Sequence, residues 1–395
     1  MKVVLSYSGG LDTSAILLLL KKEGHEVITV TVDVGQEDEL KGVEEKAYTL
    51  GSDKHYTINA VEEFAYNYIS KAIKANALYE GSYPLGTALA RPLIALKTAE
   101  VALKEEADAV AHGCTGKGND QVRFDTVLKH ALGEGFPIIA PVRDKPLTRE
   151  ESIKLLQEHG YDAGVHKKYS IDENLWSRSI EGGEIDDPSK PPGEEAFSWT
   201  TPPEKAPGEP LLLEIGFEEG VPVTVNGEEK SLPELIDFLN KEVGLHGYGR
   251  IDHVENRVVG LKSREVYEAP AALTLIKAHT DLEKTVLTPR ELRFKWLVDR
   301  EWTDLVYNGL WIEPLRETLE KAMDSLNKWI TGTVKIKVYK GGLTILARET
   351  PYTSHSVDKI NYDTGWYPSG EEARGFIEIY SMHSIASARA RTGKP

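Results

Sequence analysis

The sequence predicts an α/β protein that begins with a parallel sheet, continues with an α+β region and ends in a helix. Three observations predict this order. Short apolar segments alternate with amphipathic ones up to about His159, which is typical of a parallel sheet covered by helices on both faces. The stretch from Gly182 to Pro210 is crowded with Pro, Gly, Glu and Lys and has almost no periodicity. Beyond it, strands and helices come in separate runs.

The first region should contain five strands joined by helices. The apolar runs place them at Val3–Leu5, Val27–Val32, His55–Ile58, Ala109–Ala111 and Pro137–Ala140. Helical spacing predicts helices between them, for example at Leu89–Leu103. Crossovers between parallel strands are right-handed, and ligands bind outside the carboxyl ends of such strands. Two glycine-rich loops, Ser8–Ser14 and His112–Asp120, each follow a strand, so we expect them on one rim of the sheet.

The first loop, Ser8–Ser14, has the composition of a phosphate-binding loop. Its two glycines let the backbone approach a ligand, and the next helix directs unpaired N–H groups and its positive dipole end at an anion. Hydroxyl groups add donors, and Asp12 could hold the loop or a magnesium ion. The structural alternative is an ordinary helix start capped by Asp or Thr. The loop lacks the third glycine of the dinucleotide fingerprint, which argues against a dehydrogenase.

The second loop runs from His112 to Arg123 and combines glycines with a lysine, an arginine, an amide and a carboxylate. Such a loop can hold a zwitterion, although a capped glycine-rich connection is the structural alternative. It differs from a Walker A loop, because Ala111 and Gly118 stand where that motif needs a glycine and a Ser or Thr. Cys114 is expected to be a small packing residue rather than a nucleophile.

The remainder of the chain is expected to be α+β. Residues 182–210 should form a long surface loop. The strands and helices that follow are expected at Leu211–Phe217, Val221–Val225, Leu232–Val243, Pro289–Tyr307, Val334–Tyr339 and Leu343–Ala347. The last two strands flank Lys340-Gly341-Gly342, which predicts a hairpin. A final helix from about Glu371 to Ala390 carries apolar side chains near helical spacing and is expected to pack against another subunit.

Composition excludes several classes of protein. At 395 residues the chain can bury a sizeable core in two or three domains. Its formal charge of −16 opposes binding to nucleic acid, which needs a surplus of clustered Lys and Arg. The single cysteine excludes an internal disulfide, and the histidines lack zinc-site spacing, so no resident metal site is expected. The sequence contains no membrane-spanning run and no targeting signal, so we expect no membrane association and a cytoplasmic protein.

Three further segments are rich in polar side chains. They are Tyr83–Pro92, Ser170–Ser179 and His246–Asp252 with the nearby Glu255 and Tyr267. Each has a structural alternative. Arg91 could lie in the first turn of a core helix, and Asp172 is a plausible helix N-cap.

Ser8–Ser14 resembles the pyrophosphatase loop of the N-type ATP pyrophosphatases, which split ATP between its α and β phosphates. Together with Tyr83–Pro92, His112–Arg123, Ser170–Ser179 and Gly249–Tyr267, it resembles the successive motifs of the argininosuccinate synthase family over nearly the whole chain. The resemblance implies an ATP-dependent ligase that condenses L-citrulline with L-aspartate, releases AMP and pyrophosphate, and forms a homotetramer. It implies a nucleotide-binding domain over residues 1–165, a synthetase domain over 166–365 and a C-terminal oligomerisation helix over 366–395.

The resemblance also implies roles for individual residues. ATP would contact Ser6, Tyr7, Ser8, Gly9, Gly10, Leu11, Asp12, Thr13, Ser14, Val32 and Gly113. Aspartate would be held by Thr115, Asn119 and Asp120. Citrulline would be held by Tyr83, Thr87, Ala88, Asn119, Arg123, Ser170, Ser179, Glu255 and Tyr267. Ala88 stands where some relatives carry Ser, so a side-chain hydrogen bond is absent there. The catalytic candidates are Asp12, Lys117 and Asp120.

The chemistry needs such groups. The ureido oxygen of citrulline is a weak nucleophile, so it must be aligned with the α-phosphorus while Mg²⁺ and the first loop neutralise the departing pyrophosphate. Aspartate then displaces AMP from a citrullyl-adenylate. Asp120 would bind the aspartate amine or take its proton, and Arg123 would pair with the citrulline carboxylate. Another ATP-pyrophosphatase ligase is the nearest alternative, and a nucleotide-sensing module is the alternative from a different class.

Overall fold

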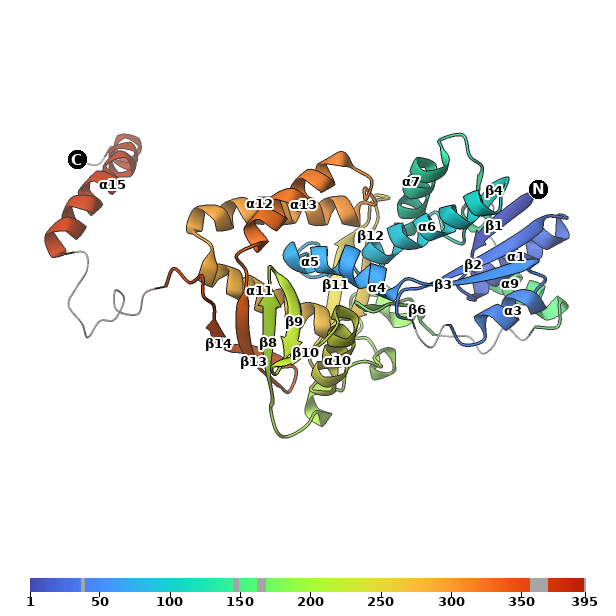
Figure 1. Ribbon diagram of the computed structural model, residues 1–395, viewed down its shortest axis with the longest axis horizontal. Helices are drawn as coiled ribbons and strands as arrows, with labels where there is room; N and C mark the ends of the chain where they lie inside the picture. Colours follow the sequence, from blue (N-terminus) through green and yellow to red (C-terminus); the bar gives the residue numbers. More distant parts are fainter. Residues whose placement is uncertain (37–39, 145–148, 162–167, 356–368, 394–395) are drawn as a thin grey trace. The chain divides into compact units, whose positions relative to one another are not determined.

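The computed structural model describes residues 1–36, 40–144, 149–161, 168–355 and 369–393, without the side chain of Arg149. The chain divides into two compact units, Met1–Tyr352 and Thr353–Pro395, and each is described by itself (Figure 1). The predicted domain boundaries after residues 165 and 365 lie outside the described residues. They stay predictions.

Five parallel strands form the first sheet, in the order β3-β2-β1-β4-β5. They are β1 (Lys2–Ser6), β2 (Glu26–Asp33), β3 (Lys54–Asn59), β4 (Ala109–Ala111) and β5 (Ile138–Ile139). Each lies at a predicted position, so the predicted parallel sheet is confirmed. From β1 the chain adds β2 and then β3 on one side of β1. It then crosses to the opposite side of β1, where it adds β4 and β5. The carboxyl ends of β1 and β4 therefore lie at the topological switch point, which is where ligands bind in sheets of this kind.

Helices cover both faces of this sheet (Figure 1). They are α1 (Leu11–Lys22), α3 (Val43–Thr49), α6 (Gly86–Lys104), α7 (Asp120–Leu132), α8 (Pro141–Asp144) and α9 (Arg149–Glu158). Val4 joins one buried cluster with side chains of α6 and α7, whereas Val3 and Leu5 join another with side chains of α1, α3 and α9. Because successive strand residues point to opposite faces, the continuous apolar run of β1 buries both.

A helical segment carries the chain from the first sheet into the second half. It consists of α4 (Val61–Phe64), the π-helix η1 (Ala65–Ile69) and α5 (Ser70–Lys74). It contacts α10 (Leu232–Leu245), α11 (Pro270–Val286) and α13 (Pro314–Asn327). One hydrophobic cluster therefore extends from the parallel sheet into the second half.

Two antiparallel sheets form that second half, as the predicted α+β region requires. The order β10-β9-β8-β13-β14 comprises β8 (Leu211–Glu218), β9 (Val221–Val225), β10 (Glu228–Glu229), β13 (Gly332–Tyr339) and β14 (Gly342–Glu349). The order β11-β12-β7-β6 comprises β6 (Ser170–Glu173), β7 (Arg178–Glu181), β11 (Arg250–Asn256) and β12 (Lys262–Glu268). The predicted hairpin is confirmed, with positive φ at Lys340 (49°) and Gly341 (78°). The predicted helix at Pro289–Tyr307 is α12.

Residues 182–210 form a connection with three short 3₁₀ helices, at Gly183–Asp186, Glu194–Ala196 and Pro203–Lys205. The prediction of a surface loop needs correction, because Ala196 and Thr200 within it are buried. The Glu268 carboxylate of β12 accepts hydrogen bonds from the backbone N–H groups of Ser198, Trp199 and Thr200 at 3.0, 2.9 and 2.8 Å. A buried charge from a distant strand thus fixes the loop.

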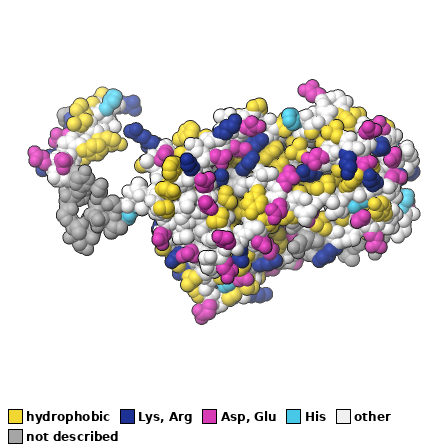
Figure 2. Space-filling model, viewed as in Figure 1, with side chains coloured by type: hydrophobic (Ala, Val, Ile, Leu, Met, Phe, Trp, Pro, Cys, Tyr) yellow, Lys and Arg dark blue, Asp and Glu magenta, His cyan; other side chains and the backbone are white. Residues whose placement is uncertain are grey.

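The second unit contains α15 (Gly370–Thr392), which has no buried residue within the described part of the chain. Ser369 and Glu372 form a capping box at its start. Its large apolar side chains are at least 46 % exposed; these are Phe376, Ile377, Ile379, Tyr380, Met382 and Ile385. Figure 2 shows hydrophobic side chains exposed on this helix. The predicted final helix is confirmed, and its packing against another subunit stays a prediction. Within the described part of the chain, every helix is too short or too polar to span a lipid bilayer.

Candidate active site

The loop between β1 and α1 is tightly curved. Gly9 has a φ of 73°, in the region that favours glycine, and a Cβ atom there would lie 3.0 Å from Cγ2 of Val43. The Ser8 hydroxyl lies 3.2 Å from that of Thr13 and accepts a hydrogen bond from the Gly10 N–H at 3.3 Å. The loop therefore keeps its curvature through its own hydroxyl groups and a glycine.

The start of α1 is not capped by Asp or Thr. Gly10 is the N-cap, Asp12 and Thr13 lie inside the first turn, and no side chain among the described residues caps the helix. The structural alternative of a side-chain cap is therefore wrong. A helix start of this kind leaves backbone N–H groups available to a ligand.

Two side chains brace this loop. Lys46 of α3 donates from Nζ to the Gly9 carbonyl oxygen at 2.5 Å. The Tyr7 hydroxyl lies 3.3 Å from Ser14 Oγ, and burial raises the pKa of Tyr7 to about 12, so this phenol stays protonated at neutral pH. Lys46 was not among the predicted residues, because it lies 37 residues from Gly9 in the chain and belongs to no motif. Of the other predicted ATP contacts, Ser6 ends β1, Leu11 begins α1 and Val32 lies near the end of β2.

The second loop lies directly against the first. A Cβ atom at Gly113 would lie 3.1 Å from Cγ2 of Thr13 and 3.8 Å from Cβ of Asp12. The two glycine-rich loops therefore meet on one rim of the sheet, at the switch point. Only a small residue at position 113 permits this approach.

His112 holds the beginning of the second loop. Its Nδ1 accepts a hydrogen bond from the Cys114 N–H at 3.2 Å, so its Nε2 is the donor to Asp125 Oδ1 at 2.8 Å. Arg143 of α8 donates to the other oxygen of Asp125 at 2.8 Å. Burial would raise the pKa of Asp125, but His112 and Arg143 hold it below its ordinary value. These hydrogen bonds connect the beginning of the second loop to α7 and α8 and so fix its orientation.

The middle of the second loop is exposed at Thr115 and Lys117. The Lys117 carbonyl accepts a hydrogen bond from Arg257 Nη1 at 3.2 Å. Burial raises the pKa of the Cys114 thiol well above its usual range. A thiol in that state is a poor nucleophile at neutral pH, which agrees with the packing role predicted for Cys114.

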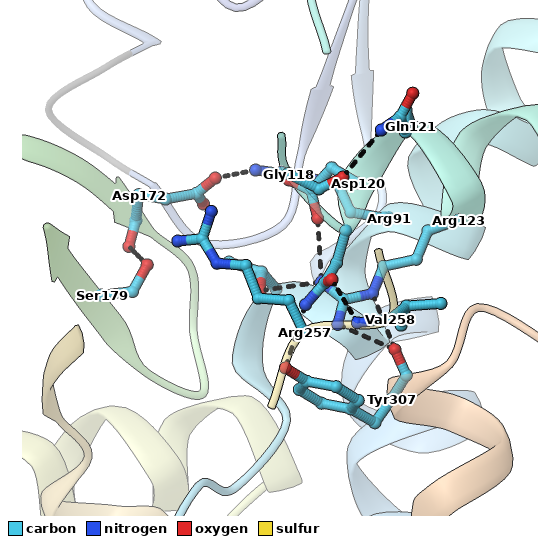
Figure 3. Close-up of polar contacts among 12 residues, drawn as sticks. Arg91, Gly118, Asp120, Gln121, Arg123, Asp172, Ser179, Arg257, Val258 and Tyr307 are labelled. Carbon is cyan, nitrogen blue, oxygen red and sulfur yellow. Dashed lines mark hydrogen bonds and ion pairs between the residues drawn. The ribbon is translucent and has the colours of Figure 1, made fainter. Parts of the chain in front are cut away.

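Asp120, the first residue of α7, lies between two arginines (Figure 3). Its Oδ2 accepts a hydrogen bond from Arg91 Nε and its Oδ1 one from Arg123 Nη1, both at 2.8 Å. Burial raises the pKa of this carboxyl group, but the two guanidinium groups outweigh burial and hold it below its ordinary value. Asp120 is therefore an anion at neutral pH and a weak proton acceptor.

Arg91 and Asp172 differ from the structural alternatives considered for them. Arg91 lies beyond the first turn of α6, which begins at Gly86, and forms an ion pair with Asp172 as well as with Asp120. Asp172 belongs to β6 and is no helix cap. Arg91 thus links three elements at the edge of the site.

A buried cluster of aromatic and polar side chains lies beyond Asp120. The rings of Tyr83 and Tyr267 stack with centroids 4.4 Å apart. Asn119 donates from Nδ2 to the Tyr307 hydroxyl at 3.0 Å. The hydroxyls of Tyr307 and Tyr267 donate to the two oxygens of Glu255 at 2.8 and 2.9 Å. Four residues predicted to hold citrulline therefore come together around Tyr307, which the sequence analysis missed.

Arg123 is 3 % exposed and already has partners within the protein. Its Nε and Nη2 donate to the Tyr307 carbonyl oxygen at 3.2 and 2.9 Å, as Figure 3 shows. Its Nη1, the donor to Asp120, also lies 3.5 Å from the Thr87 hydroxyl, which is 2.7 Å from the Tyr83 hydroxyl. Arg123 therefore also ties α7 to the end of α12.

The predicted serines lie on neighbouring strands beside this cluster. Ser179 of β7 pairs with Tyr267 across the sheet and donates from Oγ to the Asp172 carbonyl at 3.3 Å. Ser170 is exposed on the edge strand β6. Ala88 is buried in α6. Ser179 therefore lies next to Tyr267 in the sheet, whereas Ser170 pairs with Glu181 on the edge strand.

Family models and similar proteins both indicate the same family. Residues 2–162 match the family described as the arginosuccinate synthase N-terminal HUP domain, and residues 169–387 match the arginosuccinate synthase C-terminal domain. Similar proteins include argininosuccinate synthases from Hyperthermus butylicus, Pyrobaculum aerophilum and Saccharolobus solfataricus. They are 68 %, 59 % and 58 % identical over 99 % of this chain, and the alignments cover 99 %, 99 % and 100 % of those proteins.

Proposed function

The chain belongs to the argininosuccinate synthase family and condenses citrulline with aspartate at the expense of ATP in arginine biosynthesis, and we propose that the two adjoining loops and the sheet β11-β12-β7-β6 form its active site. One observation carries this assignment. The approach of Gly113 to Asp12 and Thr13 puts an anion-binding loop against a loop rich in amino-acid-binding groups. An activated phosphate and an amino acid can therefore meet there.

The phosphates of ATP bind at Ser8–Ser14. Backbone N–H groups at the start of α1 and the loop hydroxyls donate to them, and Lys46 adds a positive charge beside Gly9. The oxygen donors of Asp12, Ser8 and Thr13 fit Mg²⁺, which prefers one or two carboxylates together with substrate phosphates. When bound there, the ion would neutralise charge on the departing pyrophosphate.

Citrulline binds in the cluster of Tyr83, Asn119, Glu255 and Tyr267, with Ser170, Ser179 and the backbone at Ala88 beside it. These groups align the ureido oxygen with the α-phosphorus, and the attack forms an O–P bond as pyrophosphate leaves. The citrulline carboxylate pairs with Arg123, which must divide its donors between the ligand and its partners in the protein.

Aspartate binds at Thr115, Asn119 and Asp120. The Asp120 carboxylate holds the substrate ammonium group and is a binding residue rather than a general base, because its two arginine partners lower its proton affinity. Once the ammonium group has lost a proton to solvent, the amine nitrogen forms a bond to the ureido carbon, and the carbon–oxygen bond to AMP breaks as AMP leaves. Lys117, exposed on the same loop, remains a catalytic candidate.

The quaternary state and the compartment are part of this proposal. Exposed apolar side chains along α15 support a homotetramer sealed by this helix. Use of ATP and the single cysteine support a cytoplasmic location. Light scattering of the full chain and of a chain ending at Thr353 would show whether α15 is needed for assembly.

The decisive experiment measures pyrophosphate and AMP release from ATP with Mg²⁺, with citrulline and aspartate added singly and together. Sustained release that needs both amino acids is the expected result. Release with a different acceptor in place of citrulline would instead indicate another ATP-pyrophosphatase ligase. Binding of ATP without turnover would indicate a nucleotide sensor.

A further inference from the structure

The Tyr267 hydroxyl group lies between two carboxyl groups. It is 2.9 Å from Oε2 of Glu255 and 2.9 Å from Oε2 of Glu265. Glu255 and Tyr267 are buried, and the Glu265 side chain is 16 % exposed. Glu265 is two residues from Tyr267 on β12, on the same face of the sheet, and no role has been assigned to it above.

The two contacts of the Tyr267 hydroxyl group need two hydrogens, but the hydroxyl group supplies only one. A phenol carries one hydrogen and can donate it to only one of the two carboxyl groups. The other contact is a hydrogen bond only when that carboxyl group is protonated and donates to the phenol oxygen. Two unprotonated carboxylates held around one hydroxyl would repel each other and leave one contact without a hydrogen.

Neighbouring cations do not remove this difficulty. Arg257 donates from Nη2 to Glu265 Oε1 and to Glu181 Oε2, both at 2.9 Å, so one cation faces two carboxylates. Arg123 of α7, whose charge acts on Tyr83 and Tyr307, forms an ion pair with Asp120.

Of the remaining titratable neighbours, His253 of β11 pairs with Glu265 across the sheet and its Nε2 lies 3.4 Å from Glu80 Oε2, whereas two phenols are neutral at physiological pH. Burial raises the pKa values of Tyr83, which stacks on Tyr267, and of Tyr307, which donates to Glu255. Burial, with the charges of Glu255 and Glu181, also raises the pKa of Glu265 to about 8 against the opposing effect of Arg257. The hydrogen-bond geometry and the neighbouring charges therefore both indicate that one carboxyl group of the pair is protonated.

We propose that Glu255 and Glu265 share a single proton through Tyr267, and that Glu265 is thereby a positioning residue for citrulline. This inference rests on the proposed function, in which Glu255 and Tyr267 contact citrulline. With the proton in place, both carboxyl groups fix the Tyr267 hydroxyl and the group carries one negative charge. Without it, one contact is lost and a second negative charge faces the ligand carboxylate, so citrulline binds more weakly.

The test compares the citrulline KM of the wild type, Glu265→Gln and Glu181→Gln across about pH 6 to pH 10. Glutamine can donate an amide N–H to Tyr267 but cannot lose a proton in this range. Glu181→Gln is the matched control, because it removes a carboxylate from the same Arg257 without touching Tyr267. Titration of citrulline itself affects all three proteins equally.

In the wild type we expect KM for citrulline to rise up to tenfold per pH unit above about pH 8, with a smaller change in kcat. Glu181→Gln should keep this rise and begin it at a lower pH, because a neighbouring negative charge is gone. Glu265→Gln should lack it. The same rise in Glu265→Gln as in the wild type would overturn the proposal.

A spectroscopic measurement tests the shared proton without relying on turnover. Infrared difference spectra between neutral and alkaline pH should show loss of a carboxylic-acid C=O band in the wild type and not in Glu265→Gln. Identical difference spectra would also overturn the proposal. Failure of the proposed function would give a different result, because pyrophosphate release would then not depend on citrulline.

Discussion

Arg91 Nε and Asp120 Oδ2 lie 2.8 Å apart, and this contact joins α6 to the first residue of α7. Arg123 approaches the opposite oxygen of the same carboxylate. Because α7 begins at the end of the second loop, the position of that loop depends on these ion pairs. A ligand ammonium group that approaches Asp120 meets a carboxylate already oriented by two guanidinium groups.

Asp120→Asn should lower the free energy of unfolding at neutral pH, because two guanidinium groups lose their shared carboxylate. Breaking a fully buried pair costs about 3–5 kcal/mol, and the cost here should be smaller because the Asp120 side chain is 29 % exposed. The folded-state pKa of Asp120 is lowered, so its stabilisation is present above the ordinary value of 3.8 and is lost as the pH falls through the lower folded value. Urea denaturation between about pH 7 and pH 3 should therefore show that the free energy of unfolding falls less with decreasing pH in the variant than in the wild type.

The same variant separates binding from catalysis by Asp120. We expect a higher KM for aspartate and a kcat that changes much less once aspartate saturates. A general base would give the reverse pattern, a large fall in kcat with KM nearly constant. Thermal unfolding of the same samples shows whether each assay contains folded protein.

Arg123→Ala should weaken citrulline binding about ten-fold to a hundred-fold, because a charge-assisted hydrogen bond contributes about 1.5–3 kcal/mol and roughly 1.4 kcal/mol is tenfold. ATP affinity should change little. Since Arg123 also holds the Tyr307 carbonyl, Arg123→Lys serves as a companion that keeps the charge and loses the two-donor contact. Equal losses for both ligands would point to misfolding rather than to a citrulline contact.

Gly9→Ala should impair ATP binding more than it impairs folding. The positive φ alone costs about 1–2 kcal/mol, and the added Cβ would lie 3.0 Å from Val43, so the loop must shift. Gly24→Ala is the matched control, with a φ of 80° and nothing within 4 Å of the added atom. Calorimetric titration with ATP should show weaker binding for Gly9→Ala only. Similar ATP affinities in the two variants would refute a role for the tight approach at Gly9.

Lys46→Met should raise the KM for ATP roughly tenfold, the effect of about 1.4 kcal/mol, and leave the KM for citrulline unchanged. The reason is that the Lys46 ammonium group holds the Gly9 carbonyl and, in the proposed site, would add positive charge beside the phosphates. Lys46→Arg should recover much of the loss. Initial rates at varied ATP test this, and equal KM values for Lys46→Met and the wild type would exclude the role.

Glu268→Gln should destabilise the protein by about 3–5 kcal/mol, because Arg178 and several backbone N–H groups lose a buried carboxylate. Glu194→Gln is the control. It breaks another Glu–Arg pair of the same connection, with Arg250, but its side chain is 61 % exposed and the expected cost is below about 1 kcal/mol. Denaturant unfolding measures both, and equal losses would contradict a special role for Glu268.

Much of the parallel sheet could be predicted, because strands buried on both faces are continuous apolar runs. The β11-β12-β7-β6 sheet could not. Strand Arg250–Asn256, for example, alternates between buried and exposed positions, but charged and polar residues fill most of it, and His253 and Glu255 are buried through pairing that no local pattern reveals. The segment 61–74 was missed as a link for the same reason, since its partners are α10, α11 and α13.

The two loops, their place at the ends of β1 and β4, and the types of chemical group they carry could all be predicted from local sequence patterns. Those features depend on glycine spacing and apolar periodicity, which act over a few residues. Which charged groups and hydroxyl groups contact one another depends instead on how distant elements pack together. Asn119 and Tyr307 are 188 residues apart in the chain, and Glu255 reaches Tyr307 from another element. Such contacts depend on sheet order and helix packing. The protonation of Asp120 and of the Glu255 and Glu265 pair could therefore be inferred only from the folded chain.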